Sequence, residues 1–189
     1  MLRSIGRHLV AEGHEITVLT AQPAMNSWTA RKRMPWRERL DGFLVVRCRL
    51  FPVGFSAGLT MRSLNMLIYM FAVIRHIALR RSVNSYDVIL VSTMPPVLLA
   101  ATVRLGALLT GASFLYHIMD IYPEAAIINN RIREGLLTRW LTKIDRKNCS
   151  CAIKVVALSE DMRDTLARRG TSISNVRIIN NFQLESFGH

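Results

Sequence analysis

Short apolar runs and segments with helical periodicity alternate along the chain. The apolar runs are rich in strand formers and end at polar or turn residues, as strands do. The segments between them repeat apolar side chains at three and four positions, as helices that cover a sheet do. The predicted strands lie at 15–20, 43–48, 87–91, 113–119, 153–158 and 176–179, and the predicted helices at 1–11, 61–81, 97–110, 134–147 and after Ser159. This alternation predicts an α/β fold with a mostly parallel sheet.

One stretch, residues 112–126, joins a predicted buried strand to polar residues. Its first half is apolar, which is typical of a strand buried on both faces of a parallel sheet. The hydrophobicity stops at Asp120, and a turn proline follows at Pro123. Ligands of open α/β sheets bind beyond the carboxyl ends of the strands, so Asp120 is a candidate for chemistry. His117 is the second candidate, and its alternative is a hydrogen-bonded core histidine.

Two further groups follow predicted strands. Ser92 and Thr93 lie between the strand at 87–91 and a helix that begins after two prolines. Free backbone N–H groups at such a helix start bind anions or hydroxyls, although either side chain can equally serve as a helix cap. Glu124 follows Pro123, and its alternative role is a favourable charge in the first turn of a helix.

Charge is unevenly distributed over the 189 residues. Lys and Arg outnumber Asp and Glu by 25 to 13, which gives a net charge of +12. Residues 1–81 hold 13 basic and 4 acidic residues, whereas residues 82–189 hold 12 and 9. A basic half indicates an anionic partner, either membrane phospholipid or nucleic acid. The segment 21–41 is predicted to be a loop, and its basic run with Trp28 and Trp36 fits an anionic surface or a solvated loop equally well.

The predicted helix at 61–81 is the most apolar one. Its polar residues form one narrow stripe: Arg62, Asn65, Tyr69, His76 and Arg80. Arg75 and His76 interrupt the apolar run, which is therefore shorter than the ~20 residues that span a bilayer. The helix is expected either to be buried against the sheet or to lie in the headgroup layer of a membrane, and burial is the favoured interpretation.

Other classes of chemistry find no support in the sequence. It has no cluster of metal ligands, no nucleophile–base pair, no P-loop and no GxGxxG, so no metal or cofactor is expected. Three cysteines, Cys48, Cys149 and Cys151, lack zinc-site spacing and are expected to be free thiols in a reducing, cytosolic environment. The first ten residues lack the apolar core of a signal peptide.

Four motifs resemble the N-terminal half of retaining glycosyltransferases of family 4, which have the GT-B architecture of two Rossmann-like domains. In order, these motifs read RHLVAEGHEITVLTAQP, YDVILVSTMPPVLLAA, FLYHIMDIYPEAA, and VVALSEDMRDTLARRG followed by VRIINNF. The resemblance implies a three-layer, Rossmann-like domain over residues 1–180 and the start of an interdomain linker at 181–189. The family's first strand and its glycine turn have no counterpart in this sequence, and neither has the C-terminal domain.

The resemblance also implies roles for residues. Asp120 matches the family's active-site acid, and His117 is the expected second catalytic residue. Glu124 matches the acid of the aromatic-Pro-Glu motif, and Ser92 and Thr93 match the loop that faces the acceptor. Two positions differ from the common pattern. Met119 replaces a histidine before the acid, and the linker reads Asn180-Asn181-Phe182 where the family commonly has Asn-Gly.

The expected function is that of the acceptor-binding half of a glycosyltransferase in surface polysaccharide synthesis. A sugar would pass from a nucleotide-sugar, the donor substrate, to a saccharide or lipid-linked acceptor at the cytoplasmic face of the cell membrane. The chain alone is expected to be inactive, because the family binds the donor on the absent domain. The alternative is a non-catalytic, basic, membrane-peripheral binding module. Nucleic-acid binding ranks third, since no recognition motif accompanies the charge.

Overall fold

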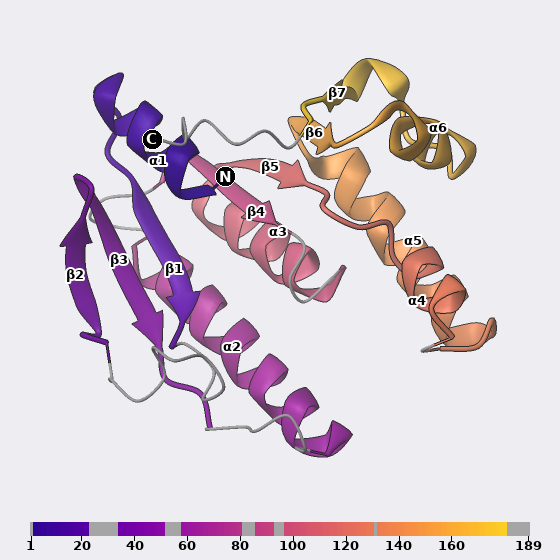
Figure 1. The fold of residues 1–189 in the computed structure, drawn as a ribbon, viewed down its shortest axis with the longest axis horizontal. Helices are drawn as coiled ribbons and strands as arrows, with labels where there is room; N and C mark the ends of the chain where they lie inside the picture. The colour runs from indigo at the N-terminus through magenta and orange to yellow at the C-terminus, as the bar shows by residue number, and fades with distance from the viewer. Residues whose placement is uncertain are drawn as a thin grey trace, which may run out of the picture. The chain divides into compact units, whose positions relative to one another are not determined.

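The computed structural model describes residues 2–22, 34–51, 58–80, 86–92, 97–130 and 132–180 (Figure 1). These residues form two compact units, one of residues 2–72 and the other of residues 73–180, and the boundary falls within a helix. The predicted α/β class is confirmed, because helices alternate with strands and most strand pairs are parallel. The predicted single domain over residues 1–180 stays a prediction.

The first unit contains helix α1 (Leu2–Ala11) and a three-stranded sheet in the order β1-β3-β2. Strands β1 (Thr17–Ala21) and β3 (Phe43–Cys48) are parallel, and β2 (Arg37–Leu40) runs antiparallel to β3. Helix α1 packs against β3, and at Gly6 an added Cβ would lie 3.3 Å from the Phe43 ring. A small residue therefore allows this helix to approach the sheet closely.

Strand β2 corrects the prediction that residues 21–41 form a loop. Asp41 and Gly42 both have positive φ angles, 51° and 86°, as a two-residue hairpin turn requires. The Arg47 guanidinium on β3 forms an ion pair with Glu38 on β2 and donates a hydrogen bond to the Pro35 carbonyl at 3.0 Å. Glu38, one of the charges that suggested a loop, therefore faces a cross-strand partner.

Helix α2 (Leu59–Leu79) confirms the long apolar helix, and its polar stripe makes contacts within the protein. The Asn65 amide exchanges two hydrogen bonds of 2.9 Å with the Phe51 backbone, and the Tyr69 hydroxyl donates to the Leu19 carbonyl at 3.3 Å. A line of exposed apolar side chains runs along the same helix: Met61, Leu64, Leu67 and Phe71. The expected burial of the apolar surface is therefore incomplete. None of the described helices is long and apolar enough to cross a membrane.

The second unit contains a parallel sheet in the order β4-β5-β6-β7. Its strands are β4 (Val88–Ser92), β5 (Ser113–His117), β6 (Lys154–Ala157) and β7 (Val176–Ile178). Its helices are α3 (Leu98–Thr110), α4 (Glu124–Ile128), α5 (Leu136–Cys151) and α6 (Glu160–Arg168), with a 3-10 turn, η2, at Ile173–Asn175. Parallel neighbours need crossover connections, which α3, α5 and α6 supply. The four strands confirm the predicted ones: β4 is shifted by one residue, and β5, β6 and β7 are shorter than predicted.

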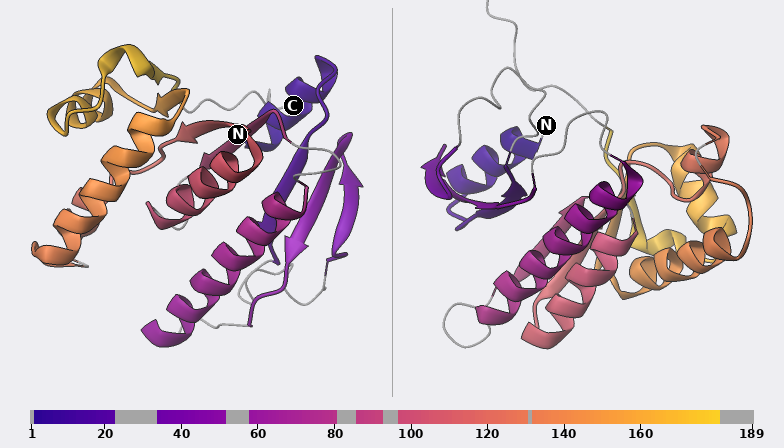
Figure 2. Two further views of the ribbon diagram at one scale, coloured as in Figure 1. Left: turned by 180° about the vertical axis from the view of Figure 1, so that it is seen from behind. Right: turned by 90° about the horizontal axis from the view of Figure 1, so that it is seen from below.

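Helices α3 and α5 pack against each other and against the sheet, as Figure 2 shows from two sides. The apolar core of this unit lies between them and the strands and includes Phe114, Tyr116, Val155 and Ala157. At Gly106 on α3, an added Cβ would lie 3.0 Å from two carbon atoms of Ile77. Glycine therefore allows α3 to approach the last turn of α2.

Helix α5 differs from the sequence prediction in the face that it buries. The helical spacing of Leu137, Trp140, Leu141 and Ile144 predicts that these side chains point inward, but Leu137 and Trp140 are 60% and 52% exposed. The buried positions of α5 are instead mostly polar: Thr138, Asp145, Asn148 and Cys149. A polar residue can replace an apolar one at such a position when a buried partner satisfies it. Asp145 has such partners on β5 and directly after α6, and Asn148 has one directly before α3.

A buried polar network links α5 to β5 and to the residue that follows α6. The Tyr116 hydroxyl donates to Asp145 Oδ1 at 2.7 Å, and Arg169 Nη1 donates to Asp145 Oδ2 at 2.7 Å. Arg169 Nε also donates to Glu124 Oε1 at 2.9 Å, and the second oxygen of Glu124 pairs with Nη2. The Arg169 side chain is only 7% exposed. One guanidinium therefore joins two carboxylates from different segments.

Strands β1 and β4 each have a single partner among the residues that the structure describes. Strand β1 pairs only with β3, and β4 pairs only with β5, so each lies at the edge of its own sheet. Edge strands leave backbone N–H and C=O groups without a sheet partner.

The buried network yields a prediction for stability. We expect Asp145→Ala to lower the free energy of unfolding by about 3–5 kcal/mol, because it removes one partner of the buried Arg169 charge. Tyr116→Phe removes one hydrogen bond to the carboxylate and is expected to cost about 1.5–3 kcal/mol. Urea denaturation followed by circular dichroism measures both effects.

Asp164→Ala is the matched control, since Asp164 pairs with Arg163 at the surface of α6. It is expected to cost less than about 1 kcal/mol. An Asp145→Ala variant as stable as this control would show that the buried network contributes little to folding.

Candidate functional site

The candidate site begins where β4 and β5 end. Ser92 and His117 are the last residues of these strands and lie opposite each other in the parallel register. Residues that are paired in a ladder point to the same face of the sheet, so the structure brings these two predicted site residues together. Thr93, predicted beside Ser92, lies outside the described residues.

The His117 side chain is buried, with 5% of its surface exposed. Burial lowers the pKa of this histidine, so the ring is neutral at neutral pH. Within the described ranges no hydrogen bond to the ring is found, and the alternative of a hydrogen-bonded core histidine therefore gains no support. A neutral imidazole has one nitrogen that can accept a proton.

The chain leaves the sheet directly after His117. The Ile118 amide donates to the Val156 carbonyl at 2.8 Å and extends the contact with β6 by one residue. Two residues later Asp120 is exposed. Its carboxylate forms no ion pair or hydrogen bond with any residue that the structure describes. An unpaired carboxylate just beyond a buried strand is available to a ligand.

Glu124 has a different environment from Asp120. It is the first residue of α4, as the alternative interpretation of a helix-start acid expected. Both of its carboxylate oxygens interact with Arg169, and Arg169 Nη2 also donates to the Tyr122 carbonyl at 2.8 Å. Arg169 thus holds the segment that follows Asp120. Contact between Glu124 and an acceptor stays a prediction.

Sequence reasoning missed Arg169 as a site-supporting residue. In the sequence, Arg168 and Arg169 fit the pattern of basic residues that favour the end of a helix dipole. Arg169 lies 45 positions from Glu124, so no local pattern connects them.

Burial sets the protonation of the supporting network. It raises the pKa of Asp145 to about 6 and lowers the pKa of Arg169 to about 10. Both groups are therefore ionised at neutral pH, and their ion pair persists there. Burial, together with the Asp145 carboxylate, raises the pKa of Tyr116, so its hydroxyl keeps the proton that it donates.

The start of α3 completes the surroundings of the site. Val97 precedes this helix and has a φ of 62°, in a region that β-branched residues rarely occupy. The Asn148 amide on α5 donates to the Val97 carbonyl at 3.0 Å, and both residues are buried. Neither Ser92 nor any other described side chain caps α3, so the proposed capping role of Ser92 is not observed.

Metal binding finds no support in the described part of the chain. No group of three or more His, Cys, Asp or Glu side chains there could hold a metal ion. Cys48, Cys149 and Cys151 form no disulfide with one another.

Comparisons with known proteins bear on what this arrangement is. A family model for the glycosyl transferase 4-like domain matches residues 1–181. WcaI of Escherichia coli strain K12, named as a colanic acid biosynthesis glycosyl transferase, is 25% identical over 190 residues. That match covers 96% of this chain and 46% of the relative, so the chain spans about half of the relative's length.

A solved structure is also similar. Alr3699/HepE of Anabaena, crystallised in complex with UDP, matches with a TM-score of 0.48 and 10% identity, over 89% of this chain and 44% of that one. The match of the family model to residues 1–181 is the decisive comparison, since it extends over nearly all of the sequence. The chain belongs to the family of glycosyl transferase 4-like domains.

Proposed function

We propose that this chain is the acceptor-binding half of a glycosyltransferase that passes a sugar from a nucleotide-sugar to a saccharide acceptor in surface polysaccharide synthesis. One observation carries the proposal: in a glycosyl transferase 4-like domain, the neutral His117 ends β5 and the unpaired Asp120 carboxylate lies three residues after it. The name of the Escherichia coli relative supports polysaccharide synthesis as the pathway class.

The proposed chemistry is a displacement at the anomeric carbon of the donor sugar. The acceptor hydroxyl oxygen forms the new bond to that carbon, and the bond from the carbon to the nucleoside diphosphate breaks. Asp120 accepts a hydrogen bond from the acceptor hydroxyl and orients it, and His117 is the neighbouring group able to take up the proton. Ser92 offers a further hydroxyl on the same face of the sheet as His117. Groups outside this chain would bind the donor diphosphate.

The role of Asp120 can be tested in a chimera that joins this chain to the C-terminal half of the Escherichia coli relative. We expect Asp120→Asn to lower kcat by about 10²-fold, because the acceptor hydroxyl loses the carboxylate that orients it. The fold should not change, because the side chain is exposed and unpaired. Asp164→Asn, a change of the same kind on the surface of α6, is the control and should transfer sugar at the parental rate. Parental activity in the Asp120→Asn chimera would remove Asp120 from the site.

The proposal also predicts that the 189-residue chain alone does not bind the donor. The family binds the nucleotide-sugar on its second domain, and this chain covers 46% of the relative's length. Isothermal titration calorimetry with UDP-, GDP- and dTDP-sugars should therefore give no binding heat. The chimera, titrated in parallel, provides the positive control. Saturable binding or sugar transfer by the chain without a partner would contradict this division of labour.

We further propose that the acceptor is lipid-linked and that the chain acts at the cytoplasmic face of the cell membrane. Support comes from the net charge of +12 and from the exposed apolar line on α2, where Phe71 is 68% exposed. Such a helix can lie in the headgroup layer with its apolar side chains among the acyl chains. Arg62 and Arg75 on the same helix would contact anionic headgroups.

This membrane proposal predicts a loss of vesicle binding when the apolar line is made acidic. We expect Leu67→Glu/Phe71→Glu to abolish flotation with phosphatidylglycerol vesicles, because both side chains would have to insert. Ile173→Glu/Ile179→Glu changes two exposed apolar residues elsewhere by the same charge and should bind nearly as well as the parent chain. Each basic residue near the surface contributes about 1 kcal/mol, so binding should also weaken as salt rises. Equal flotation of the two variants would contradict a role for α2.

A further inference from the structure

A cavity of about 540 Å³ lies in the second unit, at the amino ends of the strands, whereas the candidate site lies at their carboxyl ends. It is bounded by the second halves of α3 and α5 and by the residues that begin β5 and precede β6. The carboxyl ends of the strands carry Ser92 and His117, whereas this cavity meets the amino ends at Ser113 and Ile153. Its size lies within the range of about 300–1,000 Å³ for small-molecule sites.

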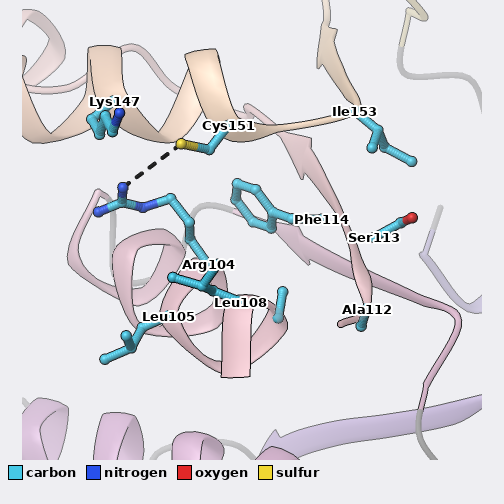
Figure 3. Close-up of a pocket in the computed structure, with 10 residues that line it drawn as sticks. Arg104, Leu105, Leu108, Ala112, Ser113, Phe114, Lys147, Cys151 and Ile153 are labelled. Carbon is cyan, nitrogen blue, oxygen red and sulfur yellow. Dashed lines mark hydrogen bonds between the residues drawn. The ribbon is translucent and has the colours of Figure 1, made fainter. Parts of the chain in front are cut away.

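The walls of the cavity have two chemical characters. One part is apolar and consists of Leu105, Leu108, Phe114 and Ile153. The other part carries two cations, Arg104 from α3 and Lys147 from α5, which lie on the same side of the cavity in Figure 3. None of the described lining residues is acidic. Two neighbouring cations without a carboxylate repel each other unless an anion lies between them.

The Arg104 guanidinium has hydrogen-bond donors that the described part of the protein leaves unsatisfied. Its Nε atom is buried and has no hydrogen-bond partner among the described residues. Its Nη1 atom donates only to the Cys151 sulfur, at 3.9 Å, and a cysteine sulfur is a weak acceptor. A guanidinium has five donors and matches the oxygens of phosphate and carboxylate groups. The unsatisfied donors therefore indicate an anionic oxygen ligand.

Helix dipoles explain only part of this arrangement. Lys147 lies near the C-terminus of α5, where the dipole favours a positive charge. Arg104 lies in the middle of α3, away from the C-terminal end of that helix, where the amides of Gly111 and Ala112 both donate to the Ala107 carbonyl. The dipole also gives no reason for the exposed apolar side chains beside these cations, such as Leu108, which is 79% exposed.

We propose that this cavity binds an amphiphilic anion, with its phosphate or carboxylate between Arg104 and Lys147 and its alkyl chain against Leu105, Leu108, Phe114 and Ile153. The apolar walls alone would accept a neutral alkyl group, and the cations alone would accept inorganic phosphate. The combination selects a ligand that has both parts. This site is separate from the candidate transferase site and does not depend on the proposed function. The ligand comes either from a membrane lipid or from a free amphiphile in solution.

Calorimetry on the full chain tests the proposal with three matched probes: octyl phosphate, inorganic phosphate and 1-octanol. We expect octyl phosphate to bind at least about tenfold more tightly than either other probe, which corresponds to about 1.4 kcal/mol. Arg104→Gln/Lys147→Gln should weaken octyl phosphate by about tenfold or more, as expected for the loss of charge-assisted hydrogen bonds. Leu108→Ser should reduce the advantage of octyl phosphate over inorganic phosphate.

The control Arg168→Gln/Arg177→Gln removes the same charge from exposed positions on α6 and β7 and should bind octyl phosphate like the parent chain. Circular dichroism verifies that each variant is folded. Three results would overturn the proposal: octyl phosphate binds no more tightly than inorganic phosphate, it binds no more tightly than 1-octanol, or both double variants lose the same affinity for it. A fourth contradicting result is that Arg104→Gln/Lys147→Gln abolishes binding of single-stranded RNA but leaves the affinity for octyl phosphate unchanged.

A second arm separates the two sources of the ligand. If phosphatidylglycerol vesicles, but not phosphatidylcholine vesicles, displace octyl phosphate, the natural ligand is a membrane lipid. If neither vesicle displaces it while the tight binding of octyl phosphate persists, the ligand is a free amphiphile. Both results support the amphiphilic anion site, and neither depends on sugar transfer.

Discussion

The ion pairs of Arg169 are the interaction on which the second unit depends most. One guanidinium contacts the carboxylates of Asp145 and Glu124 and the carbonyl of Tyr122. These partners belong to α5, to α4 and to the loop after β5, so a single side chain fixes three segments. Burying a charge is costly, and paired, hydrogen-bonded geometry is what makes it tolerable. Because the same loop carries Asp120, the interaction that stabilises the fold also determines where the candidate acid lies.

The parallel sheet supplies the second constraint, which is the order of residues at its carboxyl edge. Register places Ser92 opposite His117, so two residues 25 positions apart in the sequence reach the same face. The polar residues that follow these strands can therefore act together without any local motif. At the amino edge of the same sheet, Arg104 and Lys147 meet an apolar cavity. The two edges thus offer different chemistry, one suited to a hydroxyl acceptor and the other to an anion with an alkyl chain.

Much of this architecture could be predicted from the sequence, because buried parallel strands are continuous apolar runs. The positions of β4 to β7 and of Asp120 just beyond β5 follow from that pattern. Strand β2 could not be predicted in this way, since its charges at Arg37 and Glu38 resemble a loop and the ion pair of Glu38 depends on Arg47, nine positions further on. The buried face of α5 was also missed, because Asp145 and Asn148 are polar and only distant partners make their burial possible. The role of Arg169 was missed for the same reason, since its contacts span up to 47 positions.

The edge of β4 has a practical consequence for work in solution. This strand is apolar, and its outward residues Val88 and Leu90 are exposed, while one row of its backbone groups lacks a sheet partner in the described structure. Such an edge is a template on which a second copy of the same strand can add. Self-association is then a second-order process that competes with folding, so its rate rises with the square of protein concentration. Dilution then favours the monomer, and with self-association the melting temperature depends on the protein concentration.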